Sequence, residues 1–384
     1  MTRILLNKIC DVRDGTHNSP KYVPSGYPLV TSKNIVDGKL DLSVVNYITK
    51  NDYDKINERS KVDAGDIIMP MIGTIGNPLI IENEPEFAIK NVALIKFQNS
   101  GLNNRYVWYF LKSEAFRKYI IEKNKGGTQK FLSLGDIRSL EIPFVDLSEQ
   151  LKMVEKLDKV EGIIQKRKLE LKSLDLIIKA RFVEIFGDPL NNEKNWSIKS
   201  LETATTIVTY GLTVRPEYID EGIDLVSARE LHKGYIAYED APKISLDDFE
   251  KLSEKGKPQQ YDILFSKTGS IGHCAIVEEN KPFAITQNAA RIGLRLDIVN
   301  PVWLLHYLRM DYIQDWCRGH AKGNAVKDFQ LQDMKILPIF DCPLDLQNEF
   351  AGFIKQVDKS KTVIQKSLDE TQLLLDSLMQ KYFG

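Results

Sequence analysis

Hydrophobic residues recur at alternating steps of four and three along two stretches of the chain, residues 150–187 and 347–384. This spacing is a period of about 3.5 residues over roughly five heptads, which is typical of the buried seam of a coiled coil. No proline interrupts either stretch, and both end in Phe-Gly, where glycine suits the C-terminal cap of a helix. We therefore predict one long helix in each stretch. The predicted seam positions are Met153, Leu157, Val160, Ile164, Arg167, Leu171, Leu174, Ile178, Arg181 and Ile185 in the first stretch and Phe350, Ile354, Val357, Lys361, Ile364, Leu368, Thr371, Leu375, Leu378 and Tyr382 in the second.

The rest of the chain has a different pattern. Short apolar runs at 67–69, 78–81 and 91–97 are bounded by Gly, Pro, Asn and Asp, which is typical of strands joined by tight turns. Helical periodicity follows at 106–121 and again at 301–316, where a proline occupies the first turn. Trp108 and Trp303 lie among apolar neighbours on these helices and are expected in the core. The predicted fold class is α+β, with two similar globular domains joined by two long antiparallel coiled-coil helices.

The chain repeats itself with an offset of about 196 residues. Residues 26–35 return as 222–231, and residues 66–76 return as 262–272. The repeat preserves glycines and apolar positions, whereas the polar residues differ between the copies. Such a repeat predicts two similar domains that perform two versions of one task. The predicted divisions are a first recognition domain at 1–145, a spacer helix at 146–187, a second recognition domain at 188–343 and a second spacer helix at 344–384.

The order of these segments predicts how the helices run. Only a short segment that contains Pro189 separates Gly187 from Trp196, where the second domain begins, and the second helix leaves that same domain. The two helices are therefore expected to be antiparallel, each about 57 Å long at 1.5 Å per residue. Four polar seam residues either set the register or lie where the seam opens: Arg167, Arg181, Lys361 and Thr371.

Two related readers on a rigid spacer suit double-stranded DNA. B-DNA has a local two-fold axis and repeats every ~34 to 36 Å, so paired readers can contact two half-sites about one turn apart. Because the polar residues of the two copies differ, the two half-sites are expected to differ as well. The sequence thus favours recognition of a split, asymmetric site.

Composition limits the alternatives. The 384 residues carry a formal net charge of −1, so DNA must be met by local basic patches. The four cysteines and five histidines show no metal-ligand spacing, and we predict free thiols and no structural metal. The chain has no apolar run of membrane-spanning length and begins without a signal-peptide pattern, so a cytoplasmic, soluble protein is expected.

Three groups of residues are candidates for contact with DNA. Basic residues next to amides can read guanine and adenine edges, glycine turns admit phosphates, and basic loops can clamp the backbone. Each group also has a structural alternative: solvated surface, plain tight turns and mobile loops, respectively. The candidates are Lys33, Asn34, Lys90, Asn91, Arg229, Gln287, Asn288 and Arg291 in the first group; Gly73, Thr74, Gly76, Lys267, Thr268 and Ser270 in the second; and Lys125, Thr128, Gln129, Lys130, Lys322 and Lys327 in the third.

The chain resembles the specificity subunits of type I restriction-modification systems. The resemblance is carried by residues 66–76 with their counterpart 262–272, by Gly-Thr-Gln-Lys-Phe-Leu at 127–132 and by residues 179–189. It covers nearly the whole chain, although the Gly-Thr-Gln-Lys pattern is lost at 323–327. The resemblance implies two target-recognition domains, each reading one half of a bipartite site, with spacer helices that dock two methylation subunits. It also implies restriction motor-nuclease subunits as further partners.

We expect no catalysis and no cofactor in this chain, because it lacks a phosphate-binding loop, a methyl-transfer motif, a nucleophile elbow and a nuclease pattern. The resemblance assigns methylation by S-adenosylmethionine and ATP-dependent cleavage to the partners. Three alternatives stay open from the sequence. They are an enzyme with an unrecognised site, the specificity subunit of a stand-alone methyltransferase, and a module that bridges proteins without DNA.

Overall fold

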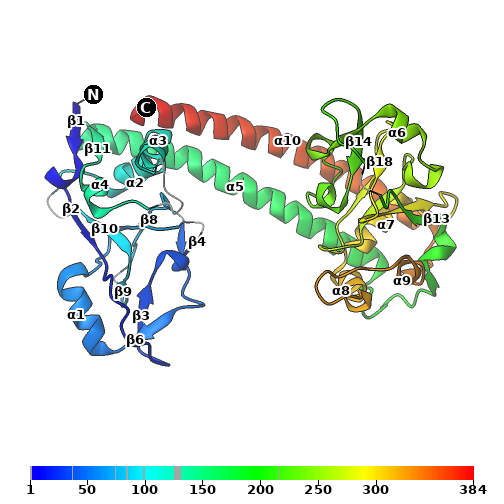
Figure 1. Ribbon diagram of the computed structural model, residues 1–384, viewed down its shortest axis with the longest axis horizontal. Helices are drawn as coiled ribbons and strands as arrows, with labels where there is room; N and C mark the ends of the chain where they lie inside the picture. The colour runs from blue at the N-terminus through cyan, green and yellow to red at the C-terminus, as the bar shows by residue number, and fades with distance from the viewer. Residues whose placement is uncertain are drawn as a thin grey trace. The chain divides into compact units, whose positions relative to one another are not determined.

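The computed structural model describes residues 2–36, 38–73, 75–83, 85–97, 100–124, 131–214 and 216–384 (Figure 1). The chain divides into two compact units. Unit 1 contains Met1–Leu169 and Gln365–Gly384, and unit 2 contains Glu170–Ile364. Each long helix therefore contributes one half to each unit. The prediction of an α+β chain with a pair of long helices is confirmed.

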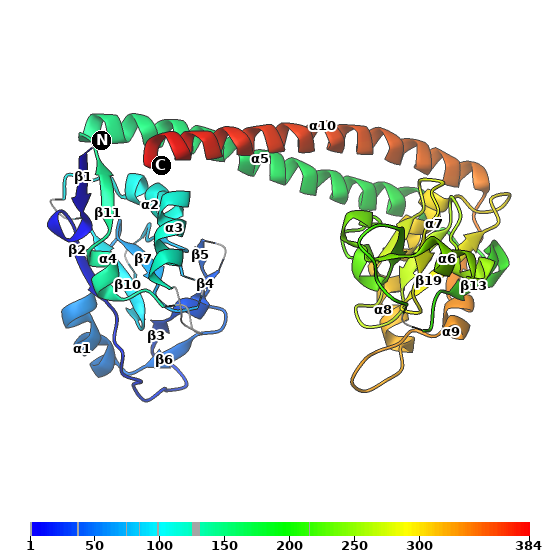
Figure 2. The same ribbon diagram turned by 45° about the horizontal axis from the view of Figure 1, so that its top comes forward.

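Unit 1 is built on an antiparallel four-stranded sheet with the order β2-β10-β7-β8. A three-stranded sheet, β6-β3-β9, a β1-β11 pair and a β4-β5 hairpin complete its strands. Helices α2 and α3 lie beside the first half of α5 (Figure 2). The bounds are β1 Thr2–Leu5, β2 Asp11–Asp14, β3 Tyr27–Val30, β4 Ile35–Val36, β5 Lys39–Leu40, β6 Asn46–Ile48, α1 Lys50–Ser60, β7 Ile67–Pro70, β8 Leu79–Ile80, β9 Ala88–Ile89, β10 Val92–Lys96, α2 Asn104–Lys112, α3 Glu114–Lys123, α4 Leu134–Arg138, β11 Glu141–Phe144 and α5 Leu147–Phe186.

Unit 2 repeats this topology. Its four-stranded sheet has the order β13-β19-β16-β17, its three-stranded sheet β15-β14-β18, and a β12-β20 pair matches β1-β11. The repeat predicted from the sequence is thus confirmed at the level of strand pairing. The bounds are β12 Ile198–Ser200, β13 Thr205–Tyr210, β14 Ile223–Val226, β15 Lys243–Ile244, α6 Leu246–Glu250, β16 Ile263–Ser266, β17 Cys274–Ile276, β18 Ala284–Ile285, β19 Ala289–Leu294, α7 Pro301–Leu308, α8 Asp311–His320, α9 Leu331–Lys335, β20 Pro338–Phe340 and α10 Leu344–Phe383.

The central strands are buried on both faces. Along β10, Ala93 and Ile95 pack into the core under α2 and α3, whereas Val92 and Leu94 pack into a second core that contains Val30. A strand covered on both sides needs apolar side chains at every position, which explains the continuous apolar run 92–95 in place of an alternating pattern. The same arrangement holds for β16 and β19 in unit 2.

The long helices begin at Leu147 and Leu344, three residues before the periodic stretches 150–187 and 347–384. Within unit 1 the beginning of α5 packs with the end of α10, since Met153 and Leu157 share a core with Phe383. Within unit 2 the end of α5 packs with the beginning of α10 through Phe182 and Phe350, whose ring centroids are 5.4 Å apart. The predicted antiparallel pairing is therefore confirmed inside each unit. Every predicted seam position is buried or half-buried.

The polar seam residues are paired across the two helices. In unit 1, Arg167 donates hydrogen bonds to the Ser367 carbonyl and the Thr371 hydroxyl. In unit 2, an Arg181 nitrogen lies 2.9 Å from a Glu349 oxygen, and Lys361 Nζ lies 2.5 Å from Asp175 Oδ1. These residues thus set the register of the helix pair, because each one has its partner at a single level of the facing helix.

A buried glutamine attaches the start of each long helix to its globular domain. Gln150 Oε1 accepts from the Asn103 backbone N–H at 2.8 Å, and its Nε2 donates to the Val145 carbonyl at 2.9 Å. Gln347 makes the same contacts with Asn300 at 2.8 Å and Cys342 at 2.9 Å. This role was not predicted from the sequence, although the glutamine is identical in both copies of a repeat whose other polar residues differ.

Replacing Gln150 with Ala is expected to destabilise unit 1 by ~1 to 3 kcal/mol, because the Asn103 N–H and two carbonyls lose their buried partner. Hydrogen exchange of α2 peptides in the full chain measures the change. Gln165→Ala, at an exposed position of the same helix, is the control and should change stability by less than ~0.5 kcal/mol. Equal effects of the two substitutions would contradict an anchoring role.

The cysteines behave as predicted free thiols. All four are buried, and burial raises the pKa of Cys10, Cys317 and Cys342 to about 12. A separate finding concerns membranes: among the described residues, no helix combines the length and the apolar composition that a membrane span requires.

Candidate nucleic-acid interface

Strand register gathers several loops of unit 1 at one end of its main sheet. Val92 at the start of β10 is opposite Pro70 at the end of β7, and Ala93 is opposite Asp14 at the end of β2. The chain therefore leaves β2 and β7 and enters β10 at the same sheet edge. The end of β3 joins them, because the Lys90 N–H donates to the Val30 carbonyl at 2.9 Å. We call residues 15–20, 31–34, 71–73, 75–76 and 90–91 the edge loops of unit 1.

Unit 2 has an equivalent set. Ala289 is opposite Ser266 at the end of β16, and Ala290 is opposite Tyr210 at the end of β13. The Thr286 N–H donates to the Val226 carbonyl at 3.0 Å, which brings in the end of β14. The edge loops of unit 2 are residues 211–214, 227–232, 267–272, 286–288 and 322–330.

Glycines permit the close approach of these loops. A Cβ on Gly15 would lie 2.2 Å from the Ile89 carbonyl oxygen, and a Cβ on Gly211 would lie 1.7 Å from that of Ile285. Both distances are far inside van der Waals contact, so another residue would push the loop away from the sheet. The predicted glycine turns are present as well: Gly73, Gly76, Gly269 and Gly272 have φ angles of 79°, 84°, 80° and 108°. Gly73 and Gly269 face open space, whereas Gly76 is close to Ile120.

The edge loops of unit 2 surround a pocket of about 480 Å³. It brings together four residues singled out from the sequence, Lys267, Thr268, Gln287 and Asn288. The other polar residues of its lining were not predicted from the sequence and come from β13, the segment before α9 and α9 itself: Tyr210, Asp328, Gln330 and Gln332. Four amide side chains therefore converge on one hollow, and all four are exposed.

The charge of Lys267 is already balanced in this pocket. The side chain is buried, and its Nζ lies 2.5 Å from Asp328 Oδ1, which also accepts from the Thr268 hydroxyl at 2.6 Å. Burial opposes the charge of Asp328, but the hydrogen bonds from Lys267 and Thr268 hold its pKa below the ordinary value. The groups left to meet a ligand here are neutral amides and the Tyr210 ring.

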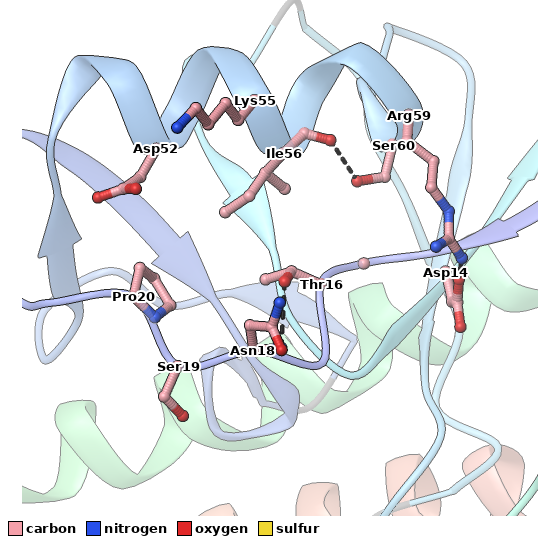
Figure 3. Close-up of a pocket in the computed structure, with 11 residues that line it drawn as sticks. Asp14, Thr16, Asn18, Ser19, Pro20, Asp52, Lys55, Ile56, Arg59 and Ser60 are labelled. Carbon is pink, nitrogen blue, oxygen red and sulfur yellow. Dashed lines mark hydrogen bonds and ion pairs between the residues drawn. The ribbon is translucent and has the colours of Figure 1, made fainter.

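The edge loops of unit 1 carry a different set of groups. A pocket of about 320 Å³ lies between α1 and residues 14–20 (Figure 3). Arg59 extends from α1 and forms an ion pair with Asp14, and Lys55 and Asp52 line the same pocket. Beside it, His17 Nδ1 lies 2.8 Å from Asn91 Oδ1.

Charged groups therefore line the pocket of unit 1, whereas the pocket of unit 2 is lined mainly by amides. His17 and Arg59 were not predicted from the sequence, because the groups that they contact are 74 and 45 positions away along the chain.

The comparison with known proteins agrees with the fold. Residues 6–173 match the family described as the type I restriction modification DNA specificity domain. The chain is 24% identical over 383 residues to the type I restriction enzyme EcoBI specificity subunit of Escherichia coli, which covers 92% of this chain and 78% of the relative.

Over most of its length the chain is similar to type I restriction enzyme specificity subunits.

Solved structures of such systems share the fold. A chain from a study of complex assembly and conformational transition in a type I system superimposes with a TM-score of 0.61 at 16% identity, over 99% of this chain and 97% of that chain. The type I S subunit from M. genitalium superimposes with a TM-score of 0.55 at 14% identity, over 100% of this chain and 96% of that one. At these identities the likeness concerns the fold.

Two of the candidate side chains are bound within the fold of this chain. The Asn34 amide is buried and donates to the Asp41 and Val44 carbonyls, while its oxygen accepts from the Thr31 N–H. Arg291 is 5% exposed, and its Nε lies 2.5 Å from Asp262 Oδ2. Both groups are structural in this arrangement, and neither is offered to a ligand at the edge.

The other candidates are distributed as follows. Lys33, Arg229, Ser270, Lys322 and Lys327 are exposed on the edge loops, and the Lys327 carbonyl accepts from the Gly269 N–H at 2.9 Å. Lys322 also lies 3.3 Å from Asp333, and Lys90 Nζ donates to Ser19 Oγ at 2.5 Å. The remaining candidates lie outside the described residues: Thr74, Lys125, Thr128, Gln129 and Lys130.

Proposed function

We propose that this chain is the DNA-reading component of a type I restriction-modification complex and that each globular domain reads one half of a split, asymmetric site. One observation carries the proposal: the same set of edge loops is built twice on equivalent strands with different side chains. Asp14, Met71 and Asn91 of unit 1 correspond to Tyr210, Lys267 and Gln287 of unit 2. The relatives named as specificity subunits support the assignment.

Chemistry suggests how each edge reads DNA. Amides pair with adenine through its N6 and N7 groups, so Gln287 and Asn288 are assigned to base edges. Exposed Lys33, Arg229 and Lys327 are assigned to phosphates or guanine, where each phosphate contact steepens the fall of affinity with salt. The open turns at Gly73 and Gly269 allow the DNA backbone to approach the main chain.

The proposal assigns no chemistry to this chain. Methylation and cleavage belong to partner proteins, two methylation subunits and restriction motor-nuclease subunits, in the cytoplasm. The long helices offer docking surfaces, since Leu169, Leu176 and Leu373 are each more than 60% exposed outside the seam. In this scheme residues 1–145 and 188–343 are the readers, and residues 146–187 and 344–384 are the spacers.

Mapping methylated bases tests the function directly. A genome that carries the gene with its partners is compared with the same genome after deletion of the gene. One split, asymmetric motif that disappears on deletion is the expected result. A methylated motif without DNA cleavage would identify a stand-alone methyltransferase complex. Absence of any such motif, with binding only to proteins, would overturn the proposal in favour of a bridging module.

Replacing both Gln287 and Asn288 with Ala is expected to lower discrimination at one half-site by about tenfold or more, because a lost amide-to-adenine pair is worth ~1 to 3 kcal/mol. The other half-site should be read as before. The measurement is competition binding of the assembled complex to duplexes that differ at single bases. Gln365→Ala on α10, where the amide contacts Asp369, is the matched control and should have no effect. An equal loss at both half-sites would contradict the assignment.

A further inference from the structure

A chain of hydrogen bonds ends on an amide at the edge of unit 1. His17 Nε2 lies 2.8 Å from Asp14 Oδ2, and His17 Nδ1 lies 2.8 Å from Asn91 Oδ1. Arg59 pairs with the other oxygen of Asp14. A backbone hydrogen bond holds Asn91 close to His17, since the Asn91 N–H donates to the Thr16 carbonyl at 3.2 Å.

With the Asn91 amide oxygen facing His17, both ring nitrogens of His17 donate. A carboxylate oxygen and an amide oxygen are acceptors only, so each ring nitrogen that faces one of them must carry a proton. His17 is therefore the imidazolium in this arrangement. The Asn91 oxygen is occupied by His17, and among the described residues its NH2 group has no hydrogen-bond partner.

Loss of the proton reverses this pattern. Asp14 retains the proton on Nε2, which leaves Nδ1 as an acceptor. The Asn91 amide must then rotate about its last side-chain bond so that its NH2 donates to Nδ1. The carbonyl oxygen takes the former place of the NH2 group, and the edge offers an acceptor where it had offered a donor.

We propose that the protonation of His17 selects which face of the Asn91 amide is presented at the edge, and that the first domain thereby changes its base preference at one position of its half-site with pH. A donor favours guanine, whose N7 and O6 are acceptors, and an acceptor favours cytosine, whose N4 group is a donor. His17 is a positioning residue in this scheme, because it acts through Asn91. The inference rests on the proposed DNA recognition.

The groups that contact His17 shift its loss of the proton to higher pH. The hydrogen bonds with Asn91 and Asp14 raise the pKa of His17 above its ordinary value, whereas partial burial and Arg59 act in the opposite direction. Other charged groups nearby are Lys90, which bonds Ser19, and Asp52 and Lys55 of α1, which line the adjacent pocket. The imidazolium of His17 therefore persists to a higher pH than that of an ordinary histidine, whose pKa is about 6.5, and it is lost as the pH rises through the raised pKa.

Unit 2 is an internal control. Tyr210 stands where unit 1 has Asp14, Thr213 stands in place of His17, and Gln287 replaces Asn91. The equivalent backbone bond is kept, since the Gln287 N–H donates to the Leu212 carbonyl at 2.8 Å. The second half-site has no such titrating relay, and its reading should not follow this transition.

The test measures binding of the full chain with its methylation subunits to duplexes that vary base by base in both half-sites, between about pH 6 and about pH 8.5. At one position of one half-site, the preference for guanine over cytosine should fall by about three- to tenfold as the pH rises, as expected for one hydrogen bond. His17→Gln should retain binding and lose the pH response. His232→Gln, at an exposed edge histidine of unit 2 that contacts the Arg229 carbonyl, should retain the response.

The ring signals of His17, assigned by comparison with His17→Gln, provide a second measurement and should titrate over the same range as the base preference. The inference is overturned if sequence-specific binding is present but its base preference does not change with pH, or if His17→Gln keeps the response. A response at both half-sites also overturns it. Absence of sequence-specific binding at every pH would instead refute the proposed function itself.

Discussion

Exchanging residues 1–145 for the corresponding domain of another type I specificity subunit is expected to replace one half of the methylated motif completely and to leave the other half unchanged. The physical reason is that the edge loops of each unit form on their own sheet, with their register set by strands of that unit alone. Methylated-base mapping of the host genome measures the outcome. The reciprocal exchange of residues 188–343 should change only the other half.

The exchanged domain must still fit the helices. Tyr106 and Phe110 of α2 contact Phe383 at the end of α10, with ring centroids 5.2 and 5.9 Å apart. A donor domain that keeps aromatic residues at these two positions is therefore the appropriate choice. Changes in both halves after such an exchange would show that the domains do not read independently.

Replacing Arg291 with Leu is expected to destabilise unit 2 by ~3 to 5 kcal/mol. Asp262 is 5% exposed, and Arg291 is its ion-pair partner, with a second bond from Arg291 to the Glu254 carbonyl at 2.7 Å. Leucine itself suits the strand, because Leu94 occupies the equivalent position of β10. The cost therefore arises from the unpaired carboxylate. Hydrogen exchange of β16 and β19 peptides in the full chain measures it.

Two controls separate charge from packing. Adding Asp262→Asn to Arg291→Leu removes the buried charge and should recover much of the stability. Lowering the pH should also recover stability, because protonation removes the charge of Asp262. Burial raises the pKa of Asp262, although the Gln259 N–H and Arg291 act to lower it. A raised carboxylate pKa means that stability falls as the pH rises through that pKa, so the single variant should be least stable above it. A loss that is independent of pH and unrelieved by the second substitution would contradict this account.

The buried aspartate of unit 1 has a different ion-pair partner from that of unit 2. Asp66 is the repeat equivalent of Asp262, and its partner is Lys96 Nζ at 2.5 Å, supplied from a position two residues further along the strand than the equivalent of Arg291. The sequence shows the two aspartates at matching positions, but it does not show which cation reaches each one. The pairing depends on which basic side chain of β10 or β19, strands that are buried on both faces, can reach the aspartate.

The long helices and the repeat were predictable because their signals are local or periodic. A 3.5-residue period persists through Arg167 and Thr371, and these interruptions proved to be partners of each other across the helices. The two units share one topology, as the repeat predicts. Glycines kept in both copies, such as Gly15 and Gly211, lie where two backbone segments are in direct contact.

The candidate interface was predictable only in part. Gln287 and Asn288 are exposed at the edge, as expected for polar turn residues immediately before a buried strand. Asn34 and Arg291 are residue types that also read DNA bases, but their side chains point inward. Asn34 binds the Asp41 carbonyl of a turn, and Arg291 binds the buried Asp262 carboxylate. Propensity does not distinguish these cases, since the deciding partners lie elsewhere in the chain.

The sequence by itself determined that this protein has two similar α+β domains, two long antiparallel helices and two unlike sets of polar turn residues, because periodicity and repetition are properties of the chain. Only the tertiary structure decided which polar groups are offered at each edge. His17 meets Asn91, and Lys267 is neutralised by Asp328, through contacts 74 and 61 positions apart. Hydrogen bonds and ion pairs act over a few ångströms in space, and strand register alone brings those atoms together.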